Sequence, residues 1–270
     1  MALGKSAAVV IGSFDLGESD RVITFYSREY GKVRGVAKAS RRMRSRFGGA
    51  LELFTLGQLV FFDTGRSDLV RVDHFDVLEP FAALRTDLER LGQAAWVVEC
   101  VNRLTAERDP HAQLYGLLTR SLRALTGAAT PPRVTVCFGV RALDVLGHRP
   151  RLDRCVECAR AYPFARPSLD EGGVVCEPCA AQAPGATPIS PAAVAALGRL
   201  RAARWEEALA QPLGRIETEL RAALEAHMTR LIGQPTRTAK FLREVQRLSD
   251  GGGAGTPPGV PLGSSTGERQ

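Results

Sequence analysis

The first 80 residues consist of short segments in which apolar, β-branched and aromatic residues are concentrated, a pattern typical of β-strands. Turn-forming residues such as TGRS (64–67) separate the segments. Five strands within about 80 residues are typical of a small closed barrel of the OB type. The predicted strands are AAVVIGSF (7–14), DRVITFYS (20–27), GKVRGVAK (31–38), ALELFTLGQLVFFDT (50–64) and DLVRVDHFDVLE (68–79).

At Pro80 the period changes to that of an amphipathic helix, with Leu84, Leu88 and Leu91 at spacings of four and three. Asp109-Pro110 and Ser190-Pro191 each resemble an N-cap followed by a first-turn proline. Residues beyond Ser249 are rich in Gly, Pro and Ser, which predicts a disordered tail. The predicted helices are 81–104, 109–125, 131–147, 192–209, 213–233 and 236–248.

Four of the six cysteines form two CxxC pairs separated by 17 residues. Two such turns can place four thiolates around one Zn²⁺, and a shell of four protein ligands makes the site structural. A pair of exposed redox motifs is the alternative, but neither pair has the strand–helix context of thioredoxin-like chemistry. The predicted ligands of one Zn²⁺ per chain are Cys155, Cys158, Cys176 and Cys179. Cys100 and Cys137 lie in apolar helical patterns and are predicted to be small buried hydrophobes.

These patterns predict a multidomain α and β protein with a finger inserted between two parts of a helical domain. The expected order is an OB-fold barrel (1–80), helices (81–150), a zinc finger (151–185), further helices (186–248) and a tail (249–270). The apolar run at the N-terminus is too short for a signal peptide. No apolar segment approaches the length needed to span a membrane. We therefore expect a cytoplasmic protein without a membrane partner.

The formal net charge of the 270 residues is +7, which favours an acidic partner. The run KVRGVAKASRRMRSR (32–46) contains seven basic residues and no acidic one. It could be a solvated loop, but a basic strand continuing into an arginine-rich loop on a small barrel favours nucleic acid. Phe14 and Phe47 could stack on bases or belong to the core. The predicted nucleic-acid-binding residues are Lys32, Arg34, Lys38, Arg41, Arg42, Arg44 and Arg46.

Motifs for catalysis do not occur in a suitable context, and we expect no enzyme activity. Gly4-Lys5-Ser6 lacks the first glycine of a P-loop, and the GxSxG match at 263–267 lies in the predicted tail. The four histidines are solitary in the sequence.

The segment VAKASRRMRSRFGGALELFTLGQLVFF (36–62), the helices from Pro80, the inserted four-cysteine finger and the closing RTAKFLREV (237–245) together resemble the bacterial RecO family. The resemblance covers residues 1 to about 248; the glycine-rich tail departs from it. It implies a recombination mediator that binds single- and double-stranded DNA, anneals complementary strands, contacts the single-strand-binding protein SSB, and acts with RecR to load RecA at gaps. A cytoplasmic, nucleoid-associated location follows from the same resemblance.

The resemblance also suggests the acidic, apolar-ended C-terminal tail of SSB as a ligand. Such a peptide needs a hydrophobic groove and arginines at its rim. Segments 117–125 and 134–146 combine apolar stripes with Arg120, Arg123 and Arg141, which are therefore the predicted partner-binding residues. Two alternatives remain: a zinc-ribbon module that binds RNA or the ribosome, with 2′-hydroxyl contacts, and a protein-only scaffold without salt-sensitive nucleic-acid binding.

Overall fold

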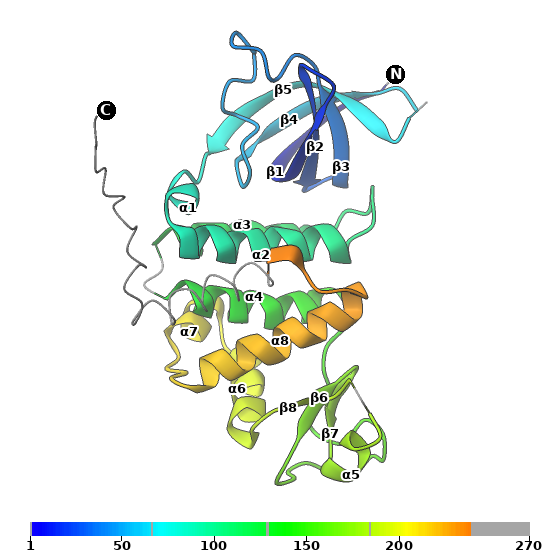
Figure 1. Cartoon of the computed structure of the whole chain (residues 1–270), viewed down its shortest axis with the longest axis vertical. Coiled ribbons are helices and arrows are strands. Elements are labelled where there is room, and N and C mark those ends of the chain that lie inside the picture. Colours follow the sequence, from blue (N-terminus) through cyan, green and yellow to red (C-terminus); the bar gives the residue numbers. More distant parts are fainter. Residues whose placement is uncertain (1, 66, 128–129, 184, 239–270) are drawn as a thin grey trace, which may run out of the picture.

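Five strands close into a barrel at one end of the molecule in the computed structural model, which describes residues 2–65, 67–127, 130–183 and 185–238 (Figure 1). The strand order around the barrel is β1-β2-β3-β5-β4, and β4 returns to β1. Only the β3–β5 pair is parallel. This arrangement confirms the predicted OB-like barrel. The strands are β1 (Ala2–Leu16), β2 (Asp20–Ser27), β3 (Gly31–Ala37), β4 (Leu56–Asp63) and β5 (Leu69–Glu79).

Strand β1 is longer than predicted because it serves both sides of the closure. Its first half pairs with β4 and its second half with β2, and the register shifts between Val10 and Gly12. A bulge of this kind bends a strand, which lets one strand turn the corner of a barrel. The barrel core is filled by side chains that include Val10, Phe25, Leu59, Phe61 and Phe75.

The predicted fourth strand begins six residues too early. Residues 50–55 form part of a long loop. Phe54 has a positive φ of 75°, its N–H donates to the Val10 carbonyl at 2.9 Å, and the Val10 N–H donates to the Thr55 carbonyl at 2.9 Å. The fully buried Phe54 packs in the core shared with the helices and not in the barrel core. The loop therefore connects the two cores.

The helices form a bundle between the barrel and the finger (Figure 1). The predicted helix 81–104 is divided at Asp87, which caps the second part by accepting a hydrogen bond from the Arg90 backbone N–H at 2.9 Å. The predicted helix 192–209 is also divided. The bounds are α1 (Ala83–Thr86), α2 (Leu88–Leu104), α3 (Ala112–Gly127), α4 (Pro131–Val145), α6 (Pro191–Ala202), α7 (Trp205–Ala210) and α8 (Ile216–Ile232).

The Ser190-Pro191 signal and the predicted end of the helix 213–233 are confirmed. Ser190 accepts a hydrogen bond from the Ala193 N–H, with Pro191 at the start of α6. Gly233 ends α8 in the left-handed conformation at φ 80°. The interpretation of Asp109-Pro110 was wrong, because α3 begins at Ala112 and the Asp109 carbonyl instead lies against Gly31 of the barrel.

The finger lies at the end of the molecule opposite the barrel (Figure 1). It contains a sheet of order β7-β6-β8 and one short helix. Helices before and after it, α4, α6 and α8, pack on one another, so the finger is an insertion into a single bundle. Its elements are β6 (Ser168–Asp170), β7 (Gly173–Val175), α5 (Glu177–Ala180) and β8 (Thr187–Pro188).

The predicted tail and nearly all of the predicted helix 236–248 lie outside the described residues. Among the helices that the structure does describe, none is long and apolar enough to cross a membrane.

Candidate nucleic-acid surface and metal centre

The seven basic residues of the run 32–46 fall into two groups with different surroundings. Lys32 and Arg34, on β3, face the segment that follows α2. The Lys32 ammonium donates hydrogen bonds to the carbonyls of Asn102 at 2.6 Å and Thr105 at 2.7 Å, and burial lowers its pKa. Arg34 forms an ion pair with Glu107 at 2.6 Å. Both residues therefore join the barrel to the bundle, and they do not extend the exposed basic loop.

Backbone contacts between β3 and the segment that follows α2 reinforce this joint between barrel and bundle. The Arg108 N–H donates to the Lys32 carbonyl at 3.0 Å, so residues 107–108 run beside the first half of β3. Strand β5 pairs with only the second half of β3. The segment after α2 thus covers a strand edge that would otherwise be open, and Arg108 adds a 2.9 Å ion pair to Asp63.

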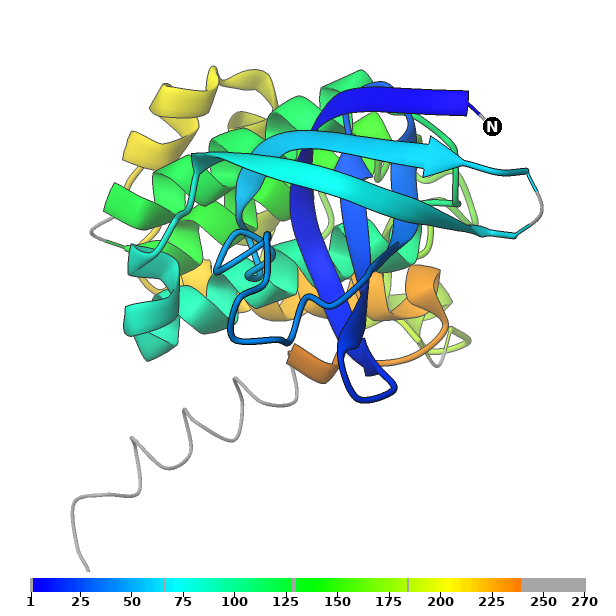
Figure 2. The same cartoon turned by 90° about the horizontal axis from the view of Figure 1, so that it is seen from above.

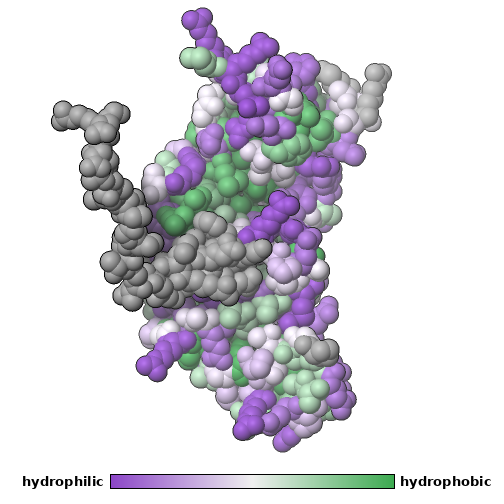
Figure 3. All heavy atoms as spheres, in the orientation of Figure 1, coloured by the Kyte–Doolittle hydropathy of each residue, from purple (hydrophilic) through white to green (hydrophobic). Residues whose placement is uncertain are grey.

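The other five basic residues form the exposed group, which we call the basic loop: Lys38, Arg41, Arg42, Arg44 and Arg46. Figure 2 shows the loop beside the hairpin that joins β1 and β2. Arg41 fixes this contact: its backbone N–H donates to the Ser19 carbonyl at 3.0 Å and its guanidinium lies 3.4 Å from Asp15. Hydrophilic residues cover much of the barrel end on the face shown in Figure 3.

The basic loop is anchored, although its charges face solvent. Phe47 is buried in the barrel core, with 4% of its surface exposed, and Arg46 lies over its ring at 5.0 Å. Phe47 is therefore a core residue and not a stacking platform. Phe14 remains 54% exposed near the tip of the neighbouring hairpin, where an aromatic ring could stack on a base.

The four predicted metal ligands meet within the finger. Their sulfur atoms all lie within 4.8 Å of one another, and Cys158 Sγ is 3.7 Å from Cys176 Sγ. Four sulfurs at about 2.3 Å from a tetrahedral Zn²⁺ would be separated by about 3.8 Å. The cluster can hold a metal ion with only small shifts in the sulfur positions.

Local folding brings the two CxxC turns together. The Ala159 N–H donates to the Cys155 carbonyl at 3.1 Å, and Ala159 has a φ of 58°, which closes the first turn. Cys176 follows β7 and begins α5, and its N–H points to the Cys155 sulfur at 3.4 Å. This N–H···S contact links the two turns.

The electrostatics of the cluster also fit a bound cation. Burial would raise the pKa of Cys155, but the backbone amides of Cys158, Cys176 and Glu157 bring it down to about 6. Hydrogen bonds with the side chains of Cys176 and Cys158 raise the pKa of Cys179 to about 12. Without a cation, neighbouring thiolates repel one another, whereas a divalent metal at the centre would favour all four as thiolates.

The structure does not bring the three predicted partner-binding arginines together. Arg123 forms a two-pronged contact with Glu79 at the end of β5, with Nε 3.0 Å from both carboxylate oxygens. Arg141 donates to the Ala203 carbonyl at 2.6 Å and lies over the Trp205 ring. Arg120 is exposed on α3.

The apolar stripes beside these arginines form the interior of the bundle. Leu118, Leu122 and Leu125 of α3, and Phe138 and Leu143 of α4, are fully buried. The hydrophobic groove expected on segments 117–125 and 134–146 is therefore not present in the described structure, because the helices pack these stripes against each other.

The fold and these sites define a class of protein: an OB-type barrel with an exposed basic loop, joined to a helical bundle that carries a four-cysteine finger. Two family models cover nearly all of it. "Recombination protein O N terminal" matches residues 1–81, and "Recombination protein O C terminal" matches residues 85–239. The chain belongs to the RecO family.

Curated relatives agree with this assignment. The chain is 38% identical to the DNA repair protein RecO of Anaeromyxobacter dehalogenans (strain 2CP-C) over 253 residues, which cover 92% of this chain and 98% of that protein. It is 34% identical to the DNA repair protein RecO of Myxococcus xanthus, over 88% of this chain and 96% of the relative. The corresponding protein of Nocardioides sp. is 35% identical, over 84% and 96%.

Proposed function

We propose that this protein is a DNA-binding recombination mediator in DNA repair that acts without turning over a substrate. It binds single- and double-stranded DNA, anneals complementary strands, and acts with RecR to load RecA on strands coated by SSB. The protein works in the cytoplasm at the nucleoid. Membership of the RecO family, whose curated relatives are DNA repair proteins, supports this proposal.

The observation that carries the proposal is the basic loop on a closed barrel. Five basic side chains lie within nine residues, 38–46, without an acidic residue among them. All five residues are exposed. Guanidinium groups can bind phosphate with two parallel hydrogen bonds. Such contacts attract a nucleic-acid backbone without reading its sequence, which suits a protein that must act at any gap.

Annealing needs no nucleotide hydrolysis under this proposal. Two single strands repel each other through their phosphates, and a basic surface reduces this repulsion. Base pairing then supplies the driving force. The basic loop provides the surface, and Phe14 on the adjacent hairpin is available to hold an unpaired base.

The finger has a structural role in this proposal. Zn²⁺ bound by Cys155, Cys158, Cys176 and Cys179 has no open coordination position and holds the two CxxC turns of the finger together. The SSB tail is retained as a proposed ligand, but the buried stripes of α3 and α4 are not its docking site.

Filter binding of the intact protein to single-stranded DNA, duplex DNA and RNA of the same sequence, across a series of salt concentrations, tests the proposal. We expect both DNA forms to bind, with affinity falling steeply as salt rises. A marked preference for RNA would support an RNA- or ribosome-associated module instead. The absence of salt-sensitive binding to any of the three would support a protein-only scaffold.

A further inference from the structure

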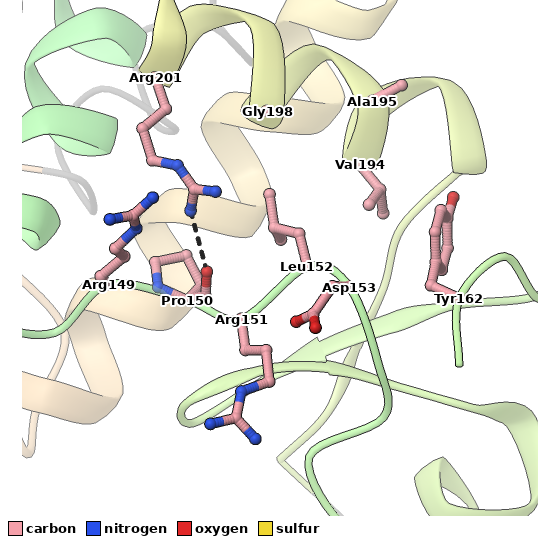
Figure 4. A pocket seen from close by; sticks show the side chains of 10 residues that line it. All are labelled: Arg149, Pro150, Arg151, Leu152, Asp153, Tyr162, Val194, Ala195, Gly198 and Arg201. Carbon is pink, nitrogen blue, oxygen red and sulfur yellow. Dashed lines mark hydrogen bonds between the residues drawn. The ribbon is translucent and has the colours of Figure 1, made fainter. Parts of the chain in front are cut away.

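A second basic region lies at the opposite end of the molecule from the basic loop, where the finger meets α6. A groove of about 590 Å³ lies between the segment leading into the finger and α6 (Figure 4). The residues that line it include Arg149, Arg151, Leu152, Tyr162, Val194 and Arg201. None of these belongs to the sites described above.

The groove combines a pair of guanidinium groups with an apolar surface. Arg201, on α6, donates to the Pro150 carbonyl at 3.1 Å, which places its guanidinium beside that of Arg149 (Figure 4). Leu152 and Val194 lie further along the groove, and Tyr162 lies at its far end. Two adjacent guanidinium groups can bind one phosphate, and apolar or aromatic side chains can contact a base.

The charges around the groove favour a polyanion over a single acidic group. Residues 144–162 and 191–204 contain seven arginines and three acidic residues, Asp144, Asp153 and Glu157. Asp153 is already paired with Arg154 at 3.0 Å, and Asp144 lies 4.0 Å from Arg149, whose side chain is still 65% exposed. Even with the double negative charge of Zn²⁺ bound by four thiolates, these segments keep an excess of positive charge. Arg151 adds a third guanidinium group to the lining of the groove.

We propose that this groove binds the backbone of a second single strand while the basic loop holds the first. The inference rests on the proposed DNA-binding function and adds a second site to it. Two sites on separate parts of one chain would let the protein hold two strands that must meet during annealing. Arg149 and Arg201 would contact phosphates, and Tyr162 would contact a base.

Counting bound strands tests this inference. The probe is a fluorescent oligothymidylate of about 12 nucleotides, a length suited to one small binding site. At low salt the intact protein is expected to bind two equivalents. A double variant, Arg149→Gln with Arg201→Gln, should bind one, because losing two phosphate contacts weakens binding by about 25-fold at 0.1 M salt and by more at lower salt. Arg149 is exposed and Arg201 is half-buried with a hydrogen bond to the Pro150 carbonyl, so the melting temperature of the variant is measured beside its binding to verify the fold.

Two further variants serve as controls. Arg42→Gln with Arg44→Gln, in the basic loop, should also retain one equivalent. Arg28→Gln with Arg215→Gln removes the same charge at exposed positions outside both regions and should bind two. In an annealing assay with complementary labelled strands, the groove and loop variants should both be slowed, whereas the matched control should not.

The outcomes separate this inference from the proposed function. If the intact protein binds no oligonucleotide, the DNA-binding function itself fails. If it binds one equivalent, lost only in the loop variant, the function stands and the second site is refuted. If an acidic peptide ending in an aromatic residue binds the intact protein, is released by the groove substitutions and is not displaced by oligothymidylate, the groove is a protein-docking site and the inference is overturned.

Discussion

Replacing Lys32 with methionine tests the division of the basic run into a joint and an exposed loop. Methionine keeps most of the apolar stem of lysine but loses the ammonium, which donates hydrogen bonds to the carbonyls of Asn102 and Thr105 between barrel and bundle. Both carbonyls lie at the C-terminal end of α2, where the helix dipole also favours a cation. The substitution therefore removes two hydrogen bonds that link the barrel to the C-terminal end of α2.

The expected loss follows from these two contacts. A hydrogen bond to a charged group contributes about 1.5–3 kcal/mol to the free energy of unfolding. Lys32 is half-buried, so water can replace part of the lost interactions, and we expect a total loss of about 2 kcal/mol. That is a change of roughly 30-fold in the unfolding equilibrium. Affinity for single-stranded DNA should stay the same, because Lys32 does not belong to the basic loop.

Lys38→Met is the matched control, since Lys38 is exposed immediately after the same strand. Its stability should change by no more than about 0.5 kcal/mol. Its affinity for single-stranded DNA should fall about fivefold at 0.1 M salt through the loss of one phosphate contact. Urea unfolding and fluorescence anisotropy measure the two properties. If Lys32→Met kept full stability and lost DNA affinity, Lys32 would belong to the DNA surface and the division would be wrong.

Three further predictions concern the metal centre, a buried histidine and the barrel–bundle joint. Chelation of zinc, or Cys176→Ser, should lower the melting temperature and solubility more than it lowers the DNA affinity of the protein that stays folded. Atomic absorption should give one zinc per chain. Metal-free protein of undiminished stability would favour the redox interpretation. Burial, helped by Arg230 and His148, lowers the pKa of His227 to about 4. The stability contributed by neutral His227 is therefore complete above the unfolded pKa of about 6.5 and declines as pH falls towards 4. The free energy of unfolding should drop by about 2 kcal/mol between pH 7 and pH 5. His227→Gln should reduce this pH dependence, and an equal pH dependence in both proteins would exclude His227 as its source. Gly31→Ala should destabilise the protein by about 2–4 kcal/mol, because Gly31 has a φ of 63° and a Cβ there would overlap the Asp109 carbonyl; the control Gly48→Ala, also at positive φ but with open space around it, should cost only the backbone term.

The features that could be predicted from sequence are those that depend on local periodicity. The barrel strands follow from alternation, and the cysteine cluster follows from two short turns that need little tertiary context. The division of the first helix at Asp87 was missed because the apolar stripe continues across the break, although Asp87 followed by Leu88 and Glu89 is a recognisable cap.

Long-range packing determined what the sequence could not reveal. Alternation placed Lys32 and Arg34 on one face of β3, but nothing in the sequence indicated that residues 107–108 would cover that face. The stripes on α3 and α4 were correctly identified as apolar, yet whether they line a groove or a core depends on their mutual packing. Arg149 and Arg201 of the groove at the finger lie 52 residues apart in the sequence, and only the fold brings them together.

The central claim is that the basic loop binds the DNA backbone. Its most direct test is the salt dependence of single-stranded DNA binding by Arg42→Gln with Arg44→Gln, measured by anisotropy beside the intact protein and the matched control Arg28→Gln with Arg215→Gln. Losing two phosphate contacts should reduce the slope of log affinity against log salt by about 1.4, equally for every DNA sequence tested. The control should keep the slope of the intact protein. If the loop variant keeps both slope and affinity, the basic loop is a solvated loop and the DNA surface lies elsewhere.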